Sequence, residues 1–71
     1  TISIYPNPTS GRVYIKGLNS AANATVYSVD GRKLFTQIIT NSYIDLNLSS
    51  GMYMLQIATE GKMSVKKIII D

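Results

Sequence analysis

Chemistry in this sequence would have to come from carboxylates and hydroxyls, because the chain has no histidine and no cysteine. Glycoside hydrolysis needs two facing carboxylates about 5–10 Å apart. The four acidic residues are scattered along the chain, at Asp30, Asp45, Glu60 and Asp71. No spacing among them favours a pair. The serines lack an imidazole partner, and neither G-x-S-x-G nor S-x-x-K occurs. We therefore predict that the chain is not an enzyme.

Metal ions and cofactors also lack a motif in this chain. Without cysteine or histidine the usual zinc ligands and all disulfide bonds are excluded. Neither a glycine-rich phosphate-binding loop nor a D-x-D-x-D-G calcium loop is present. The sequence predicts no metal site and no cofactor.

The net charge is +3, from seven cationic and four acidic residues. The cations are spread through the chain, and they form adjacent pairs only at Arg32-Lys33 and Lys66-Lys67. Nucleic-acid-binding domains gather basic residues on one face, so we predict no nucleic acid partner. The longest apolar run is Ile68–Ile70, far short of the roughly 18 residues of a membrane span. We predict no insertion into a membrane.

The elements that must position these side chains are short strands. Apolar and polar residues alternate with period two almost throughout, and helical spacing is nearly absent. With 45% hydrophobic and 15% charged residues in 71, residues 1–71 should form a single domain. Regular strand spacing predicts an all-β fold, a small seven-stranded antiparallel β-sandwich. The expected strands are residues 2–5, 12–16, 24–29, 33–40, 43–48, 52–59 and 63–70.

The turns between these strands are marked by proline and glycine. Pro6 and Pro8 cannot donate to a ladder and must end the first strand. Asp30-Gly31 predicts a type I′ hairpin, and Glu60-Gly61 is a second candidate for a tight hairpin. The adjacent cations Lys66 and Lys67 break the alternation of the last strand. They predict a bulge, or a strand with solvent on both faces.

Taken in order, four segments of the chain resemble the C-terminal sorting domain, type A, of proteins exported by the type IX (Por) secretion system of Bacteroidetes. The resemblance covers nearly the whole chain. The segments are Tyr5-Pro6-Asn7-Pro8; residues 26–32 with Asp30 and Gly31; residues 44–53 with Leu48, Gly51 and Tyr53; and residues 65–70.

This resemblance implies an Ig-like sandwich that carries no chemistry of its own. Such a domain directs larger N-terminal cargo, an enzyme or adhesin in the same chain, through a translocon to the cell surface or medium. A sortase-like surface protease typically removes it. The chain opens on Thr1-Ile2 without a start methionine or signal peptide, so we expect a fragment of a larger secreted protein.

Within the resemblance, the last strand is the expected recognition element. We predict that Lys66, Lys67, Ile68, Ile69 and Ile70 are read by the export machinery, with an unpaired terminal strand docking by β-augmentation. The simpler interpretation is a plain last strand whose lysines keep an edge soluble. Tyr53 is expected to anchor the core, with its hydroxyl at the edge.

A second functional hypothesis stays open at this point. The domain could be an accessory module of a secreted hydrolase, either fibronectin-like or carbohydrate-binding. Exposed tyrosines would then bind sugar, and the candidates are Tyr14, Tyr27 and Tyr43.

Overall fold

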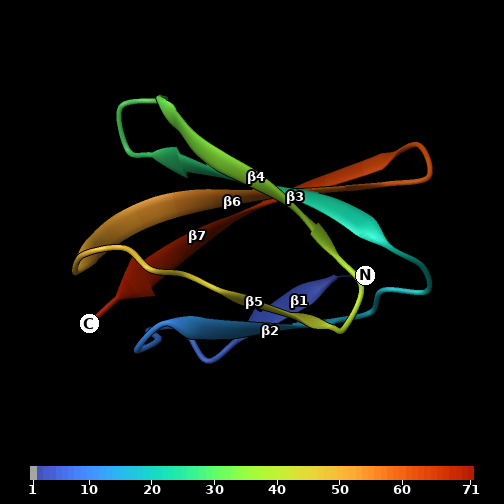
Figure 1. The fold of residues 1–71 in the computed structure, drawn as a ribbon, viewed down its shortest axis with the longest axis horizontal. Helices are drawn as coiled ribbons and strands as arrows, with labels where there is room; N and C mark the ends of the chain where they lie inside the picture. The colour runs from blue at the N-terminus through green and yellow to red at the C-terminus, as the bar shows by residue number, and fades with distance from the viewer. Residues whose placement is uncertain (1) are drawn as a thin grey trace.

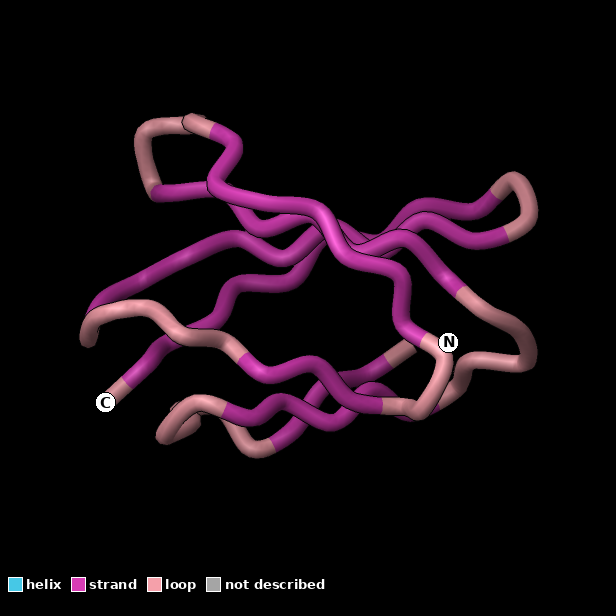
Figure 2. Tube along the Cα trace, viewed as in Figure 1, coloured by secondary structure: helices cyan, strands magenta, loops and turns pink. Residues whose placement is uncertain are grey.

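Alternating apolar residues give seven strands in the computed structural model, which describes residues 2–71 (Figure 1). The strands form two antiparallel sheets, in the orders β1-β2-β5 and β4-β3-β6-β7. The predicted all-β sandwich is confirmed, and the tube in Figure 2 shows strands and loops only for these residues. The strands are β1 (Ser3–Tyr5), β2 (Arg12–Lys16), β3 (Ala22–Ser28), β4 (Lys33–Ile39), β5 (Tyr43–Asp45), β6 (Gly51–Thr59) and β7 (Lys62–Ile70).

The core lies between the two sheets and is built from one face of each. Val13 and Ile15 of β2, and Leu55 and Ile57 of β6, are buried two residues apart, as the period-two pattern predicts. Ile68 and Ile70 of β7 close the core on one side. The buried apolar side chains are Val13, Ile15, Ala22, Ala24, Val26, Ile39, Ile44, Leu46, Leu55, Ile57, Ile68 and Ile70.

Strand β5 is shorter than the expected strand 43–48. Its ladder with β2 ends at the pair Arg12–Asp45, because β2 begins at Arg12. One further hydrogen bond, from the Leu46 N–H to the Gly11 carbonyl at 2.7 Å, closes the junction. Inward and outward side chains still alternate through Leu48. The alternation in the sequence thus predicts which way the side chains point, but it does not predict where the hydrogen-bonded ladder between the two strands ends.

The turn between β3 and β4 differs from the predicted type I′ hairpin. That turn needs positive φ at both central residues. Gly31 has φ of 89°, whereas Asp30 keeps the negative φ usual for a residue with a side chain. The Gly31 N–H donates to the Ser28 carbonyl at 3.0 Å, and the Ser28 N–H donates to the Arg32 carbonyl at 2.9 Å. These bonds close a loop of three residues, 29–31, whereas a type I′ hairpin turn has two.

The turn at Glu60-Gly61 is the tight two-residue hairpin of this fold. Thr59 pairs directly with Lys62, so the loop contains only these two residues. Both have positive φ, 21° at Glu60 and 76° at Gly61. The predicted second hairpin is confirmed, and its two positive φ angles match type I′.

Strand β7 contains no bulge at Lys66-Lys67, so the first of the two predicted alternatives is wrong. Nine consecutive pairs join β6 and β7 without a shift of register, from Gly51–Ile70 to Thr59–Lys62. Lys66 points to the inner face, where it is half-buried, and Lys67 points outward. The alternation in the sequence broke because a cation stands at an inward position, and the backbone stays regular.

Candidate recognition surface

The predicted recognition residues lie on β7 but do not share one environment. Ile68 and Ile70 are buried in the core, and Ile69 is half-buried on the outward face. Lys67 is exposed beside it, and Lys66 is half-buried at the rim of the inner face. In the folded domain a partner can therefore reach Lys67, Ile69 and the end of Lys66, whereas Ile68 and Ile70 hold the strand in place.

The outer edge of β7 is occupied by Asn7, between the two prolines of the first turn. Its side-chain Nδ2 donates to the Lys67 carbonyl at 2.8 Å. The Ile69 N–H donates to the Asn7 Oδ1 at 3.0 Å. A carboxamide carries the same donor and acceptor as a peptide unit, so this side chain takes the place of a strand residue.

Thr9 continues this contact with its backbone. Its N–H donates to the Ile69 carbonyl at 2.8 Å, and its carbonyl accepts from the Asp71 N–H at 2.9 Å. The residue is only 2% exposed. Its hydroxyl accepts from the Gly11 N–H at 3.1 Å and donates to the Arg12 carbonyl at 2.5 Å. We name residues 6–9 the edge clamp.

The edge clamp changes the expectation of an unpaired terminal strand. β7 is the last strand of its sheet, but from the Lys67 carbonyl to the Asp71 N–H its outward groups are bonded to Asn7 and Thr9. The premise of an unpaired strand is therefore wrong for this stretch. Main-chain pairing there would require the clamp to leave.

Tyr53 packs against the core from the inner face of β6. Its hydroxyl donates to the Ser49 carbonyl at 2.8 Å, across the turn that opens the strand. Its ring lies 3.8 Å from where a Cβ on Gly51 would stand. Leu48, half-buried, packs against the same core. The segment from Leu48 to Tyr53 thus fixes the start of β6, the strand that pairs with β7.

Asp30 works within its own turn. Its carboxylate accepts a hydrogen bond from the Ser28 hydroxyl, which lowers the pKa of Asp30 below its ordinary value of 3.8. The Arg32 guanidinium lies 3.8 Å away, and both side chains are well exposed. This arrangement stabilises the turn and points no group toward β7.

Tyr5 belongs to a row of aromatic rings on the outward face of the small sheet. It stacks on Tyr14 with ring centroids 5.5 Å apart, and Tyr14 meets Tyr43 edge-on at 6.1 Å. Tyr27 lies on β3, in the other sheet. Of the three tyrosines proposed to bind sugar, Tyr14 and Tyr43 thus share one face and Tyr27 lies apart from them.

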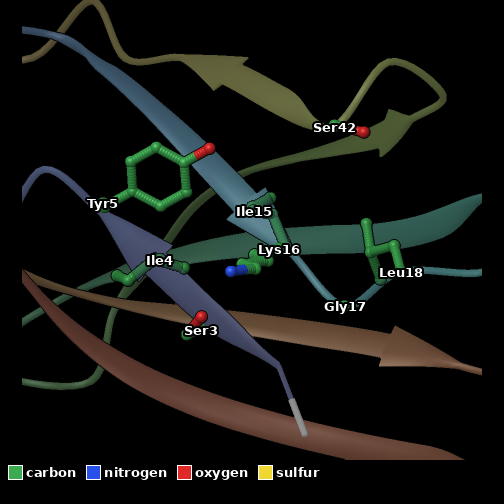
Figure 3. Close-up of a pocket in the computed structure, with 8 residues that line it drawn as sticks. All are labelled: Ser3, Ile4, Tyr5, Ile15, Lys16, Gly17, Leu18 and Ser42. Atoms are coloured by element: carbon green, nitrogen blue, oxygen red, sulfur yellow. The ribbon is translucent and has the colours of Figure 1, made fainter.

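A hollow lies beside β1 and the end of β2 (Figure 3). The side chains around it are mostly apolar or hydroxyl-bearing, and Lys16 is the one charged group. Within residues 2–71 no cluster of three acidic side chains is positioned to hold a metal ion. The same residues include no helix with the length and hydropathy of a membrane span.

Comparison with protein families shows the family to which the chain belongs. Residues 3–71 match the family model described as the secretion system C-terminal sorting domain. The chain belongs to this family. Domains of this kind are sorting signals for type IX secretion, and they mark proteins for export across the outer membrane to the cell surface or medium. Among curated proteins, no match to the chain was found.

The sorting domain also contains structural residues that sequence reasoning did not single out. Thr9 is the clearest, and its signal was a Thr-Ser-Gly turn, in which a hydroxyl often bonds the N–H two residues later. Arg12 and Asp45 form an ion pair at 2.7 Å across β2 and β5. Arg12 also lies 4.2 Å from the centroid of the Tyr43 ring. Only the register of the two strands could have paired them.

Proposed function

We propose that the export machinery reads the accessible side chains in the C-terminal half of β7 in the folded sorting domain. The readable groups are the exposed Lys67, the half-buried Ile69 beside it and the end of Lys66 at the rim. The translocon and a sortase-like surface protease are the partners, and residues 1–71 act as a non-catalytic C-terminal domain behind larger cargo.

The observation that carries this proposal is the edge clamp. It bonds both main-chain groups of Ile69 on the outer edge of β7, the N–H through Asn7 and the carbonyl through Thr9. Bonded on both edges, β7 presents its outward side chains in one fixed arrangement. A partner then recognises side chains, because the main-chain groups between Lys67 and Asp71 are already paired.

The test is secretion of a reporter in a Bacteroidetes host. A periplasm-directed fluorescent protein carries residues 1–71 at its C-terminus, and the host either has or lacks the type IX translocon. The double variant Lys66→Ala/Lys67→Ala is compared with Lys16→Ala/Lys62→Ala, which removes the same charge elsewhere. We expect the first variant to lose most surface and medium fluorescence and the second to behave as wild type.

Two measurements keep this result interpretable. Thermal unfolding of each purified domain shows whether a variant is folded, and immunoblotting shows whether the fusion is intact. Normal export of folded Lys66→Ala/Lys67→Ala would disprove recognition through these lysines. An equal loss in both double variants would show that net charge, and not the C-terminal half of β7, governs export, because Lys62 stands at the opposite end of that strand.

A further inference from the structure

The outward face of the four-stranded sheet exposes large apolar side chains on β4, β6 and β7. The register places Met52, Met54 and Ala58 of β6 beside Ile69, Lys67 and Met63 of β7. On β4, at the far edge of the sheet, Ile38 points outward opposite Asn23 of β3. Ile38 and Met63 are each 64% exposed, and Val65 is 55% exposed. The polar side chains Asn23, Thr25, Thr36 and Gln56 share this face, so the exposed apolar residues gather mainly on β6 and β7. An exposed apolar patch of this kind can mark an interaction site.

The three methionines of the chain all lie on this face. Met52 and Met54 alternate with Tyr53 and Leu55, which face the core, and Met63 stands at an outward position of β7. Methionine is flexible and polarisable, so it adapts to more than one partner surface. In the core its flexibility would be a disadvantage, and the core contains only β-branched residues, leucine and alanine.

Charge on this face has one sign. Among the outward positions of β3, β4, β6 and β7, all within the described residues, the charged side chains are Lys67 and Lys33, which pairs with Tyr27. The nearest acidic residues, Asp30 and Glu60, lie in turns at the ends of the strands. A complementary partner is therefore apolar with carboxylates.

The size of the face argues against a second copy of the chain. Four strands about 4.8 Å apart, with about seven residues of 3.3 Å each, give an area on the order of 400 Å² per copy. A symmetric pair would bury roughly 800 Å², below the about 1,200 Å² of a stable interface. It would also place cationic faces against each other. A transient contact with a larger protein fits both the area and the charge.

We propose that this face, from β7 across to β4, docks on a surface of the type IX export machinery that is apolar and bears carboxylates. The inference rests on the proposed function and extends it, because Lys67 and Ile69 lie on the outward side of β7, the edge strand of the same sheet. The sorting signal is then a sheet face and not a strand alone.

The experiment uses Ile38, which is three strands away from β7. Ile38→Glu and Ile38→Lys remove the same apolar contact and add opposite charges. Ser3→Glu and Ser3→Lys make the same charge changes on the outward face of the small sheet. All four are tested in the reporter assay and for binding of the purified domain to isolated, detergent-solubilised type IX translocon. Thermal unfolding confirms that each is folded.

We expect Ile38→Glu to weaken binding and export about tenfold, with Ile38→Lys several-fold better, because like charges meet only in the first. Both Ser3 variants should match wild type. Normal export of Ile38→Glu alongside failure of Lys66→Ala/Lys67→Ala would overturn the face while leaving β7 recognition intact. An equal loss of binding and export in Ile38→Glu and Ile38→Lys would overturn the inference that the partner bears carboxylates.

Two other occupants of this face, a second copy of the chain and a membrane surface, are tested by direct measurement. A self-association that Ile38→Glu abolishes, seen by sedimentation of the purified domain, would overturn the proposal in favour of a second copy. Binding to anionic vesicles that Ile38→Lys strengthens, without binding to the translocon, would overturn it in favour of a membrane surface. Monomeric domain that ignores vesicles and binds the translocon supports it.

Discussion

Asn7 shows how a single side chain can protect a sheet edge. Edge strands invite pairing with other chains, and proteins commonly block them with charge, proline or a covering loop. Here the carboxamide of Asn7 bonds a carbonyl and an N–H of β7, sixty or more residues away in sequence. Prolines on both sides of Asn7 restrict its backbone, so less freedom is lost when the bonds form.

Replacing Asn7 with alanine tests this role. The change leaves the Lys67 carbonyl and the Ile69 N–H without their partner, and we expect a loss of about 1–2 kcal/mol in the free energy of unfolding. Denaturant titration measures it, and hydrogen exchange at the Ile69 amide should accelerate. Asn47→Ala, at another exposed asparagine, serves as the control. A protected Ile69 amide in Asn7→Ala would contradict the clamp.

The Arg12–Asp45 pair predicts a pH dependence of stability. The guanidinium donates to the Asp45 carboxylate and lowers its pKa below the ordinary value of 3.8. A carboxylate with a lowered folded pKa stabilises the fold above its unfolded pKa, and this contribution disappears as the pH falls through the folded pKa. The benefit is therefore complete above about pH 5 and is lost below pH 4.

The variant Asp45→Asn isolates that contribution. Its melting temperature should lie below that of wild type at pH 6, and the gap should close as the pH falls toward 2. Asp30 also has a lowered pKa and titrates in the same range, but it is present in both proteins and cancels from the difference. A gap that is constant with pH would show that the ion pair contributes nothing through charge.

At the level of elements, the sequence predicted the number and faces of the strands better than their ends. Alternation recorded which side chains reach the core, because the strand period is two. It could not show where a ladder stops, since that depends on the partner strand, as at β5. The edge clamp was invisible for the same reason. Its residues suggested a turn, but not the distant strand that they contact.

The β6–β7 hairpin offers a direct test of turn chemistry. Glu60 has positive φ in a two-residue turn, a conformation that asparagine tolerates better than glutamate. We expect Glu60→Asn to raise the unfolding free energy by about 0.5–1 kcal/mol, and Glu60→Val to lower it, because a β-branched residue resists this φ. Thermal unfolding measures both. Equal destabilisation by both variants would show that the turn is not type I′.

At the level of the whole molecule, the two faces of β7 have different roles. Its inward side chains Ile68 and Ile70 close the core between the sheets, and its outward side chains Lys67 and Ile69 face solvent. The edge clamp then ties this strand to the first turn of the small sheet. Folding and presentation of the signal are therefore coupled through one strand, since loosening the core also disorders the surface.

The pair Ile68→Ala and Val65→Ala separates these tasks. Ile68 is fully buried and Val65 is 55% exposed on the same strand. The first change leaves a cavity between the sheets and should cost about 2–5 kcal/mol, whereas the second should cost less than about 1 kcal/mol. For a domain of this size, each kcal/mol lowers the melting temperature by about 4–8 °C. Export of Ile68→Ala should fall near its melting temperature and recover on cooling, because the outward residues are intact. If Ile68→Ala failed to export even when fully folded, Ile68 itself would have to be read, and the division of β7 into an inward and an outward task would not hold.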